Sequence, residues 1–176
     1  MSTLKVDSIA NVAGTVNKGI LQVVTASVAT LVTTSSSSFA DLTGLACTIT
    51  PRASSSKILV FFSFVPTGPS GTYGHYNVER AISGGATSNI FMGDADSNRT
   101  RCIGSQYFHS SMNNYYSGQN YAFIGVDSPS TTSAVTYQIQ ASSSTGAVGV
   151  NRDAYNDDRA EDPVTTSHIT VMEIQG

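Results

Sequence analysis

The chain has 176 residues, of which 40% are hydrophobic and only 12% charged, and its net charge is −3. This length suits a single domain with or without a tail, and the apolar content is too high for a disordered chain. Since no basic cluster exceeds two residues, nucleic acid is not expected as a partner.

Residues 1–19 are polar and irregular, with a few scattered aliphatic side chains, and we expect them to form an extended N-terminal arm. From residue 20 onward, short β-branched and aromatic runs alternate with Gly, Pro and Ser turns, which is typical of an all-β domain. The sequence therefore predicts a β-sandwich head, jelly-roll-like, over residues 20–176. The expected strands are 20–25, 28–33, 45–50, 58–65, 75–82, 90–92, 101–108, 121–126, 134–141, 147–152 and 169–175.

Three of these strands have a clear facial pattern. In 45–50 and 134–141, every second residue is apolar, which predicts one buried face. The residues expected on these faces are Leu45, Cys47 and Ile49, and Val135, Tyr137, Ile139 and Ala141. The last strand is apolar on both faces, so we expect the C-terminus to be ordered inside a sheet.

The segment 58–65 is the most hydrophobic in the chain. It is far shorter than the roughly 18–20 residues needed to cross a bilayer, so we expect a strand and no membrane insertion. Its two faces are Ile58, Val60, Phe62 and Phe64 on one side, and Leu59, Phe61, Ser63 and Val65 on the other. We expect both to be buried, one by the opposing sheet and the other by a covering loop or a neighbouring subunit.

The sequence has no motif for a catalytic nucleophile, a phosphate-binding loop or a zinc site, and we expect neither enzymatic activity nor a cofactor. His75, His109 and His168 are far apart in the chain. Cys47 and Cys102 are expected to be buried free thiols, with a disulfide as the alternative.

Two acidic segments raise the question of a cation site. Asp94, Asp96 and Asn98 have the spacing that opens a calcium loop, but Arg99 and Ser105 stand where that loop needs Gly and Glu. We expect a turn there, with calcium as the alternative. The acidic run 153–162 is expected to be a solvated loop, with a cation site or a contact to a neighbour's Arg as alternatives.

The segment 106–121 is rich in Tyr, Ser, Asn and Gly, the residue types of adaptable binding loops. Aromatic faces and amide groups suit sugars, so this segment is a candidate for glycan binding. A loop that covers a sheet edge or contacts a subunit fits it at least as well, and both interpretations stay open here. The candidate residues are Tyr107, His109, Asn113, Asn114, Tyr115, Tyr116 and Tyr121.

Several short motifs occur in an order that resembles a module in virion proteins of tailed bacteriophages of aquatic bacteria. They are Phe39-Ala-Asp-Leu-Thr-Gly-Leu45, Thr48-Ile-Thr-Pro51, Ser55-Ser-Lys-Ile-Leu-Val60, Gly93-Asp-Ala95, Arg99-Thr-Arg101, Val150-Asn-Arg152 and Ile169-Thr-Val-Met-Glu-Ile174. The opening, Ser2-Thr-Leu-Lys-Val-Asp-Ser-Ile9, is similar to the end by which such fibres attach to the particle.

This resemblance implies a homotrimeric virion protein of the tail-fibre type, assembled in the host cytoplasm and displayed for host attachment. Its arm would contact other virion proteins through Leu4, Val6, Ile9 and Val12. Two alternatives remain open at this stage. One is a head fibre or decoration protein that stabilises the capsid, and the other is a carbohydrate-binding module for host polysaccharide.

Overall fold

The computed structural model describes residues 19–109, 119–152 and 163–176. All regular elements of these residues are strands, and no helix long and apolar enough to cross a bilayer occurs among them. The strands are β1 (Ile20–Val28), β2 (Val32–Thr34), β3 (Ala40–Ile49), β4 (Lys57–Phe64), β5 (Pro66–Thr67), β6 (Thr72–Ile82), β7 (Thr87–Ile90), β8 (Gly104–Phe108), β9 (Tyr121–Asp127), β10 (Val135–Ser143), β11 (Val148–Val150) and β12 (Ser167–Ile174).

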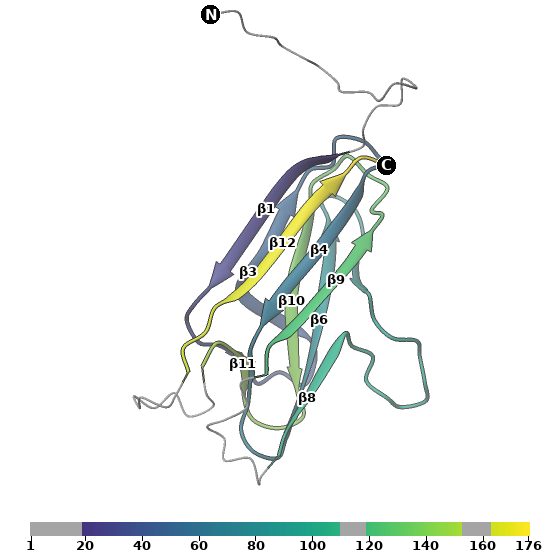
Figure 1. Cartoon of the computed structure of the whole chain (residues 1–176). Helices are drawn as coiled ribbons and strands as arrows, with labels where there is room; N and C mark the ends of the chain where they lie inside the picture. Colours follow the sequence, from purple (N-terminus) through teal and green to yellow (C-terminus); the bar gives the residue numbers. More distant parts are fainter. Residues whose placement is uncertain (1–18, 110–118, 153–162) are drawn as a thin grey trace, which may run out of the picture.

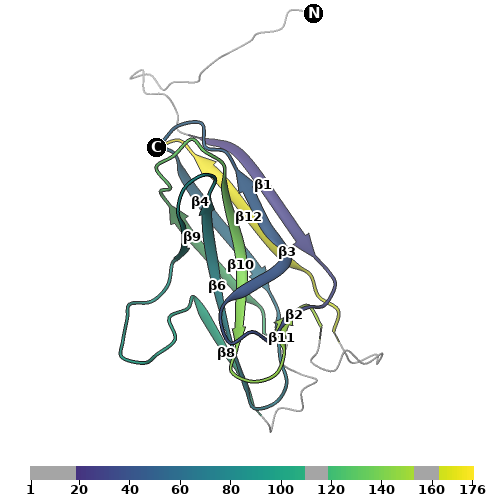
Figure 2. The ribbon, with the colours of Figure 1, turned by 180° about the vertical axis from the view of Figure 1, so that it is seen from behind.

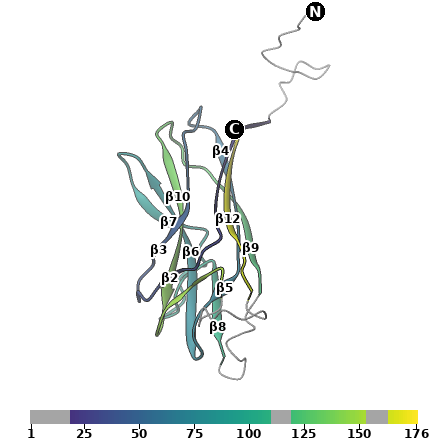
Figure 3. The same ribbon diagram turned by 90° about the vertical axis from the view of Figure 1, so that its left-hand side faces the viewer.

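Two antiparallel sheets pack face to face, which confirms the predicted all-β sandwich. The first sheet has the order β1-β12-β4-β9 and lies in front in Figure 1. The second has the order β3-β10-β6-β7, with β8 also paired to β6, and comes to the front when the molecule is seen from behind (Figure 2). Figure 3 shows the two layers edge-on.

The strand order is that of a jelly roll. β7 and β8 pair with successive halves of β6 and together occupy one strand position. Counted in this way, eight main strands form sheets in the order first-eighth-third-sixth and second-seventh-fourth-fifth. This interleaving is the double Greek key of jelly-roll domains.

The core lies between the sheets and contains the side chains that alternation predicted. All four inward residues of β10 from Val135 to Ala141 are at most 1% exposed, as are Ile169 and Val171 of β12. β12 lies between β1 and β4, so the C-terminal strand is inside a sheet, as expected. Since a buried Val, Leu, Ile or Phe side chain contributes about 1.5–3 kcal/mol, this layer dominates the stability of the head.

β4 confirms the predicted burial of one face of 58–65 and leaves the other face open in the single chain. Ile58, Val60, Phe62 and Phe64 are buried against the second sheet. The opposite face is open: Phe61 is 37% exposed and Leu59 is only partly buried. Within the described residues no loop crosses this face (Figure 1). Of the two predicted covers, a loop is therefore not found among the described residues, and a neighbouring subunit stays a prediction.

Several strand limits differ from the sequence prediction, and three of the differences concern β1, β3 and β5. β1 runs without a break to Val28, and β3 begins five residues early, at Ala40. Pro66, predicted to end a strand, instead begins β5, the edge of a small third sheet with the order β2-β11-β5. Proline is tolerated there because an edge position does not require its missing N–H.

Glu173, near the end of β12, is a buried carboxylate that joins three segments. The Arg52 backbone N–H donates to Oε1 at 2.7 Å, and the Gln22 amide donates to Oε2 at 2.6 Å. Burial by itself raises the pKa of this carboxyl, but the hydrogen bonds to it outweigh burial and hold the pKa below its ordinary value. Glu173 thus fixes β1 and the β3–β4 loop to the end of the sandwich.

The predicted arm and the acidic run fall outside the described residues. This applies to Leu4, Val6, Ile9 and Val12, and to residues 153–162. The first described strand begins at Ile20.

Candidate functional site

An exposed pair of tyrosines lies on the outer face of the second sheet, where β6 pairs with β8. Tyr73 and Tyr107 are directly opposite in the antiparallel register, and their ring centroids are 4.4 Å apart with a 31° angle between planes. Tyr73 is 47% and Tyr107 38% exposed, so much of each ring remains open to solvent. Cross-strand aromatic pairs of this kind are stabilising, which holds both rings in place.

Two histidines extend this pair along the strands. His75 is two residues after Tyr73, with ring centroids 6.3 Å apart and nearly parallel planes. His109 is two residues after Tyr107 and meets it edge-on, with ring centroids 5.6 Å apart. Side chains two residues apart on a strand share a face, so the four rings form one aromatic cluster, defined as Tyr73, His75, Tyr107 and His109.

Unused hydrogen-bonding capacity lies beside the cluster. Burial lowers the pKa of His75 below its usual value, so this imidazole is neutral at physiological pH. Its Nδ1 and both side-chain polar atoms of Asn77, on the same face of β6, have no hydrogen-bond partner among the described residues. Buried polar groups are normally paired. The Asn77 side chain is fully buried, so its amide lies beneath the cluster and is not open to a ligand.

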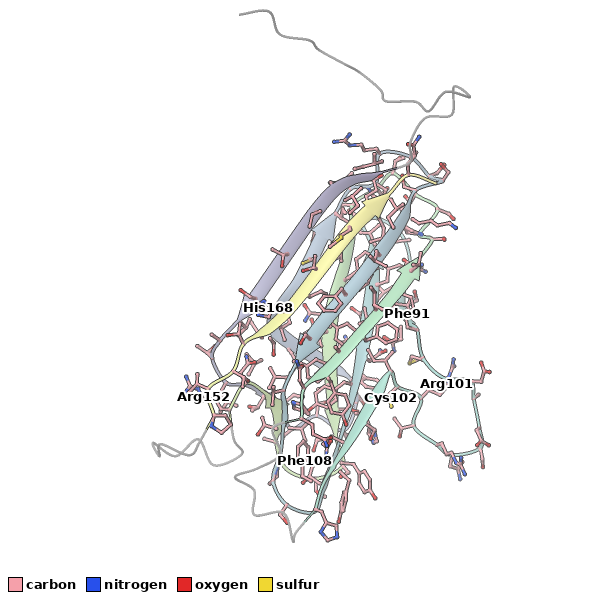
Figure 4. All side chains as sticks on the ribbon, viewed as in Figure 1. Phe91, Arg101, Cys102, Phe108, Arg152 and His168 are labelled. Carbon is pink, nitrogen blue, oxygen red and sulfur yellow. The ribbon has the colours of Figure 1, made fainter. Side chains whose placement is uncertain are left out.

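The backbone of Tyr73 is fixed by two hydrogen bonds to Ser144. Its N–H donates to Ser144 Oγ at 2.9 Å, and its carbonyl accepts from the Ser144 N–H at 3.0 Å. On the inner side of β8, Phe108 is buried and lies near the lower end of the sandwich (Figure 4). The cluster is therefore supported by a fixed strand pair over a packed core.

The structure brings together two of the predicted glycan-binding residues, Tyr107 and His109. Tyr121 lies apart from them: its ring stacks on Phe64 at 5.8 Å, and its hydroxyl donates to Gln106 Oε1 at 2.8 Å. Gln106 and Tyr107 point to opposite faces of β8, so Tyr121 supports the strand from the core side. Asn113, Asn114, Tyr115 and Tyr116 lie outside the described residues.

Tyr73 and His75 were not among the predicted site residues. The predicted strand in this region begins at His75 and does not include Tyr73, whereas β6 begins at Thr72. The alternation of Tyr73, His75 and Asn77 was a signal for a polar and aromatic face. Their contact with Tyr107 depends on the register of β6 and β8, which cannot be predicted from the sequence.

The other candidate sites within the described residues are a turn and two cysteines. In the described part of the chain, no three His, Cys, Asp or Glu side chains are grouped as metal ligands. Asp96 pairs with Arg99 at 3.1 Å in an exposed loop, and the Arg99 N–H donates to the Asp96 carbonyl, as in the turn expected there. Both cysteines are free thiols, as predicted; Cys47 is buried and Cys102 is half-buried.

A small pocket lies between β8 and β9, next to the core. Its lining is apolar apart from the hydroxyl groups of two tyrosines, and it consists of Phe62, Phe64, Tyr76, Ile103, Gly104, Tyr121, Ala122 and Phe123. Its lining has no carboxylate, imidazole or thiol, and its two phenols have pKa values that burial raises further above their usual value.

Comparison with known proteins adds no family to this description. No protein-family model matches the chain, and no curated protein matches it significantly. The resemblance to phage virion proteins therefore remains a prediction from the short motifs.

Proposed function

We propose that the chain is a non-enzymatic virion protein of a tailed bacteriophage, of the tail-fibre or appendage type. Its N-terminal arm attaches it to other virion proteins, and its jelly-roll head binds a glycan on the host surface. The order of the sequence motifs supports the virion part. The observation that carries the binding part is the exposed aromatic cluster of β6 and β8.

The cluster has the chemistry that sugar recognition requires. The apolar C–H face of a pyranose can lie on the open faces of Tyr73 and Tyr107, while its hydroxyls pair with imidazole and phenol groups. Because both rings are already fixed by their strands, little side-chain freedom is lost on binding. The mechanism is adhesion, with no bond made or broken.

The fold is compatible with this proposal but does not decide it. Jelly rolls serve as viral capsid domains and as lectins. A fold hosts many functions, so the assignment depends on the site.

Replacing both tyrosines in the double variant Tyr73→Ala/Tyr107→Ala is expected to weaken glycan binding at least ten-fold. One aromatic contact contributes roughly 0.5–1.5 kcal/mol beyond its buried area, and about 1.4 kcal/mol corresponds to ten-fold in affinity. The measurement is binding of the purified full chain to a printed panel of bacterial O-antigen and capsular polysaccharides.

Two control variants accompany this measurement. Tyr73→Phe/Tyr107→Phe keeps both rings and is expected to retain most of the binding. Arg99→Ala changes an exposed residue in the 91–103 loop and is expected to bind like the wild type. If the double alanine variant binds as well as the wild type, or the wild type binds no polysaccharide, the glycan assignment is wrong.

A capsid head fibre or decoration protein is the second candidate function. It is favoured by the open apolar face of the first sheet, because a shell protein needs extended contacts. Gold-labelled antibody against the purified chain, applied to phage particles that encode it, separates the two. Label at the tail supports the appendage, and label over the capsid supports decoration.

A further inference from the structure

The outer face of the β1-β12-β4-β9 sheet carries rows of apolar side chains that cross all four strands. The antiparallel register aligns one row of Val23, Met172, Leu59 and Val126. The next row is Thr25, Thr170, Phe61 and Ile124. We call Val23, Leu59, Phe61, Ile124, Val126 and Met172 the outer apolar face.

These side chains are open to solvent in the single chain. Ile124 is 61%, Val23 55% and Val126 53% exposed. The row that follows is small and polar, with Ser27, His168, Ser63 and Ala122 in register. His168 marks that end of the sheet in Figure 4. The apolar rows are thus bounded on one side by a polar rim, the arrangement found at protein interfaces.

The second sheet provides an internal comparison. Its outward positions on β10 are Thr136, Gln138 and Gln140, and the Gln140 amide donates to Asp41 at 2.8 Å and to Glu79 at 3.1 Å. The same chain therefore builds a polar outer face on one sheet and an apolar one on the other. The difference is specific to the first sheet and does not follow from the overall composition.

The size of the face suits a partner with the same surface. Four strands at about 4.8 Å spacing and eight residues at about 3.4 Å give the whole outer surface of the sheet, polar rim included, a projected area of roughly 500 Å², of which the two apolar rows make up about half. Two such faces in contact remove roughly 1,000 Å² from water, the lower bound for a specific interface. An exposed apolar patch of several hundred Å² marks an interaction site.

The charge of the face also favours a second copy of the chain. Among the outward residues of these four strands, only Lys57, at the end of β4, carries a permanent charge. A strongly charged partner would find nothing to pair with, whereas two identical apolar faces meet without like-charge repulsion. A second copy is also present wherever the first one is.

We propose that the outer apolar face is the self-association surface of this protein, covered in the homo-oligomer by other copies of the chain. Residues such as Phe61 and Ile124 are then buried between subunits. The aromatic cluster lies on the opposite sheet and stays accessible. This inference does not depend on the proposed function, because it follows from the first sheet alone.

The test is the mass of the full chain in solution, by light scattering during gel filtration at tens of micromolar. The wild type is expected at two or three times the 18.4 kDa of one chain. Ile124→Lys, which places a charge in the middle of the face, is expected at 18.4 kDa with an unchanged circular dichroism spectrum. Thr48→Lys adds the same charge at an exposed site on the other sheet and is expected to keep the wild-type mass.

A wild type that runs as a monomer would overturn the proposal, as would an Ile124→Lys variant with the wild-type mass. The second outcome would place self-association elsewhere, for example in the N-terminal arm. Failure here is distinguishable from failure of the glycan assignment, because monomeric Ile124→Lys retains Tyr73 and Tyr107 and its polysaccharide binding can be measured separately.

Discussion

Phe62→Asp is expected to abolish folding of the head, whereas Phe61→Asp leaves it folded. Phe62 is 2% exposed, and its ring stacks on Phe64 and Phe123 at centroid distances of 5.7 and 5.4 Å. Removal of a buried Phe side chain costs about 3–5 kcal/mol, and a buried unpaired carboxylate adds several more. Domains of this kind are stable by only about 5–15 kcal/mol in total.

Phe61 is the matched control, since it is the adjacent residue of the same type on the same strand. In Phe61→Asp the new carboxylate points to solvent in the single chain. This variant is expected to have a lower oligomer mass without loss of secondary structure. Soluble yield and circular dichroism at 25 °C measure both variants. A folded Phe62→Asp protein, or an insoluble Phe61→Asp protein, would contradict the assignment of the two faces of β4.

Asp127→Ala is expected to destabilise the head by about 3–5 kcal/mol, the usual effect of removing one partner from a buried ion pair. Asp127 on β9 accepts from Arg80 on β6 at 2.9 Å and from the Tyr137 hydroxyl on β10 at 2.8 Å. It therefore connects the two sheets. Burial, followed by the hydrogen bond to Asp127, raises the pKa of Tyr137, so the phenol remains a donor at all physiological pH values.

Thermal unfolding tests this prediction. For a domain of this size each kcal/mol lowers Tm by about 2–4 °C, so a fall of roughly 6–20 °C is expected. Asp94→Ala is the control, because Asp94 is exposed in the β7–β8 loop. Equal Tm values for Asp127→Ala and the wild type would show that the inter-sheet bridge contributes little.

The sequence was sufficient to predict strands whose burial is decided by alternation. In β10, successive side chains point to opposite faces, so the apolar residues at every second position share the core face. These residues, Val135, Tyr137 and Ile139, are all buried. The same reasoning does not decide the case of Phe61. A large apolar side chain predicts burial, but the sequence does not say whether its own chain or another provides the cover.

Features that depend on non-local pairing or on special backbone were also missed. The beginning of β3 contains Gly44 with φ of 85°, and a Cβ there would lie 2.7 Å from a Val28 methyl. This glycine interrupts the period-two pattern, so the sequence indicated only the second half of the strand. Only part of the aromatic cluster was predicted. Tyr107 belongs to a segment whose composition is recognisable, whereas Tyr73 lies next to it only because of the β6–β8 register.

Competition for phage adsorption is the most direct test of the proposed function. The purified full chain, incubated with the bacterium on which the phage grows, is expected to slow adsorption of the phage several-fold. Tyr73→Ala/Tyr107→Ala at the same concentration is expected to leave the adsorption rate unchanged. If the wild-type chain does not slow adsorption, or both proteins slow it equally, the aromatic cluster is not a receptor-binding site and the proposed function is wrong.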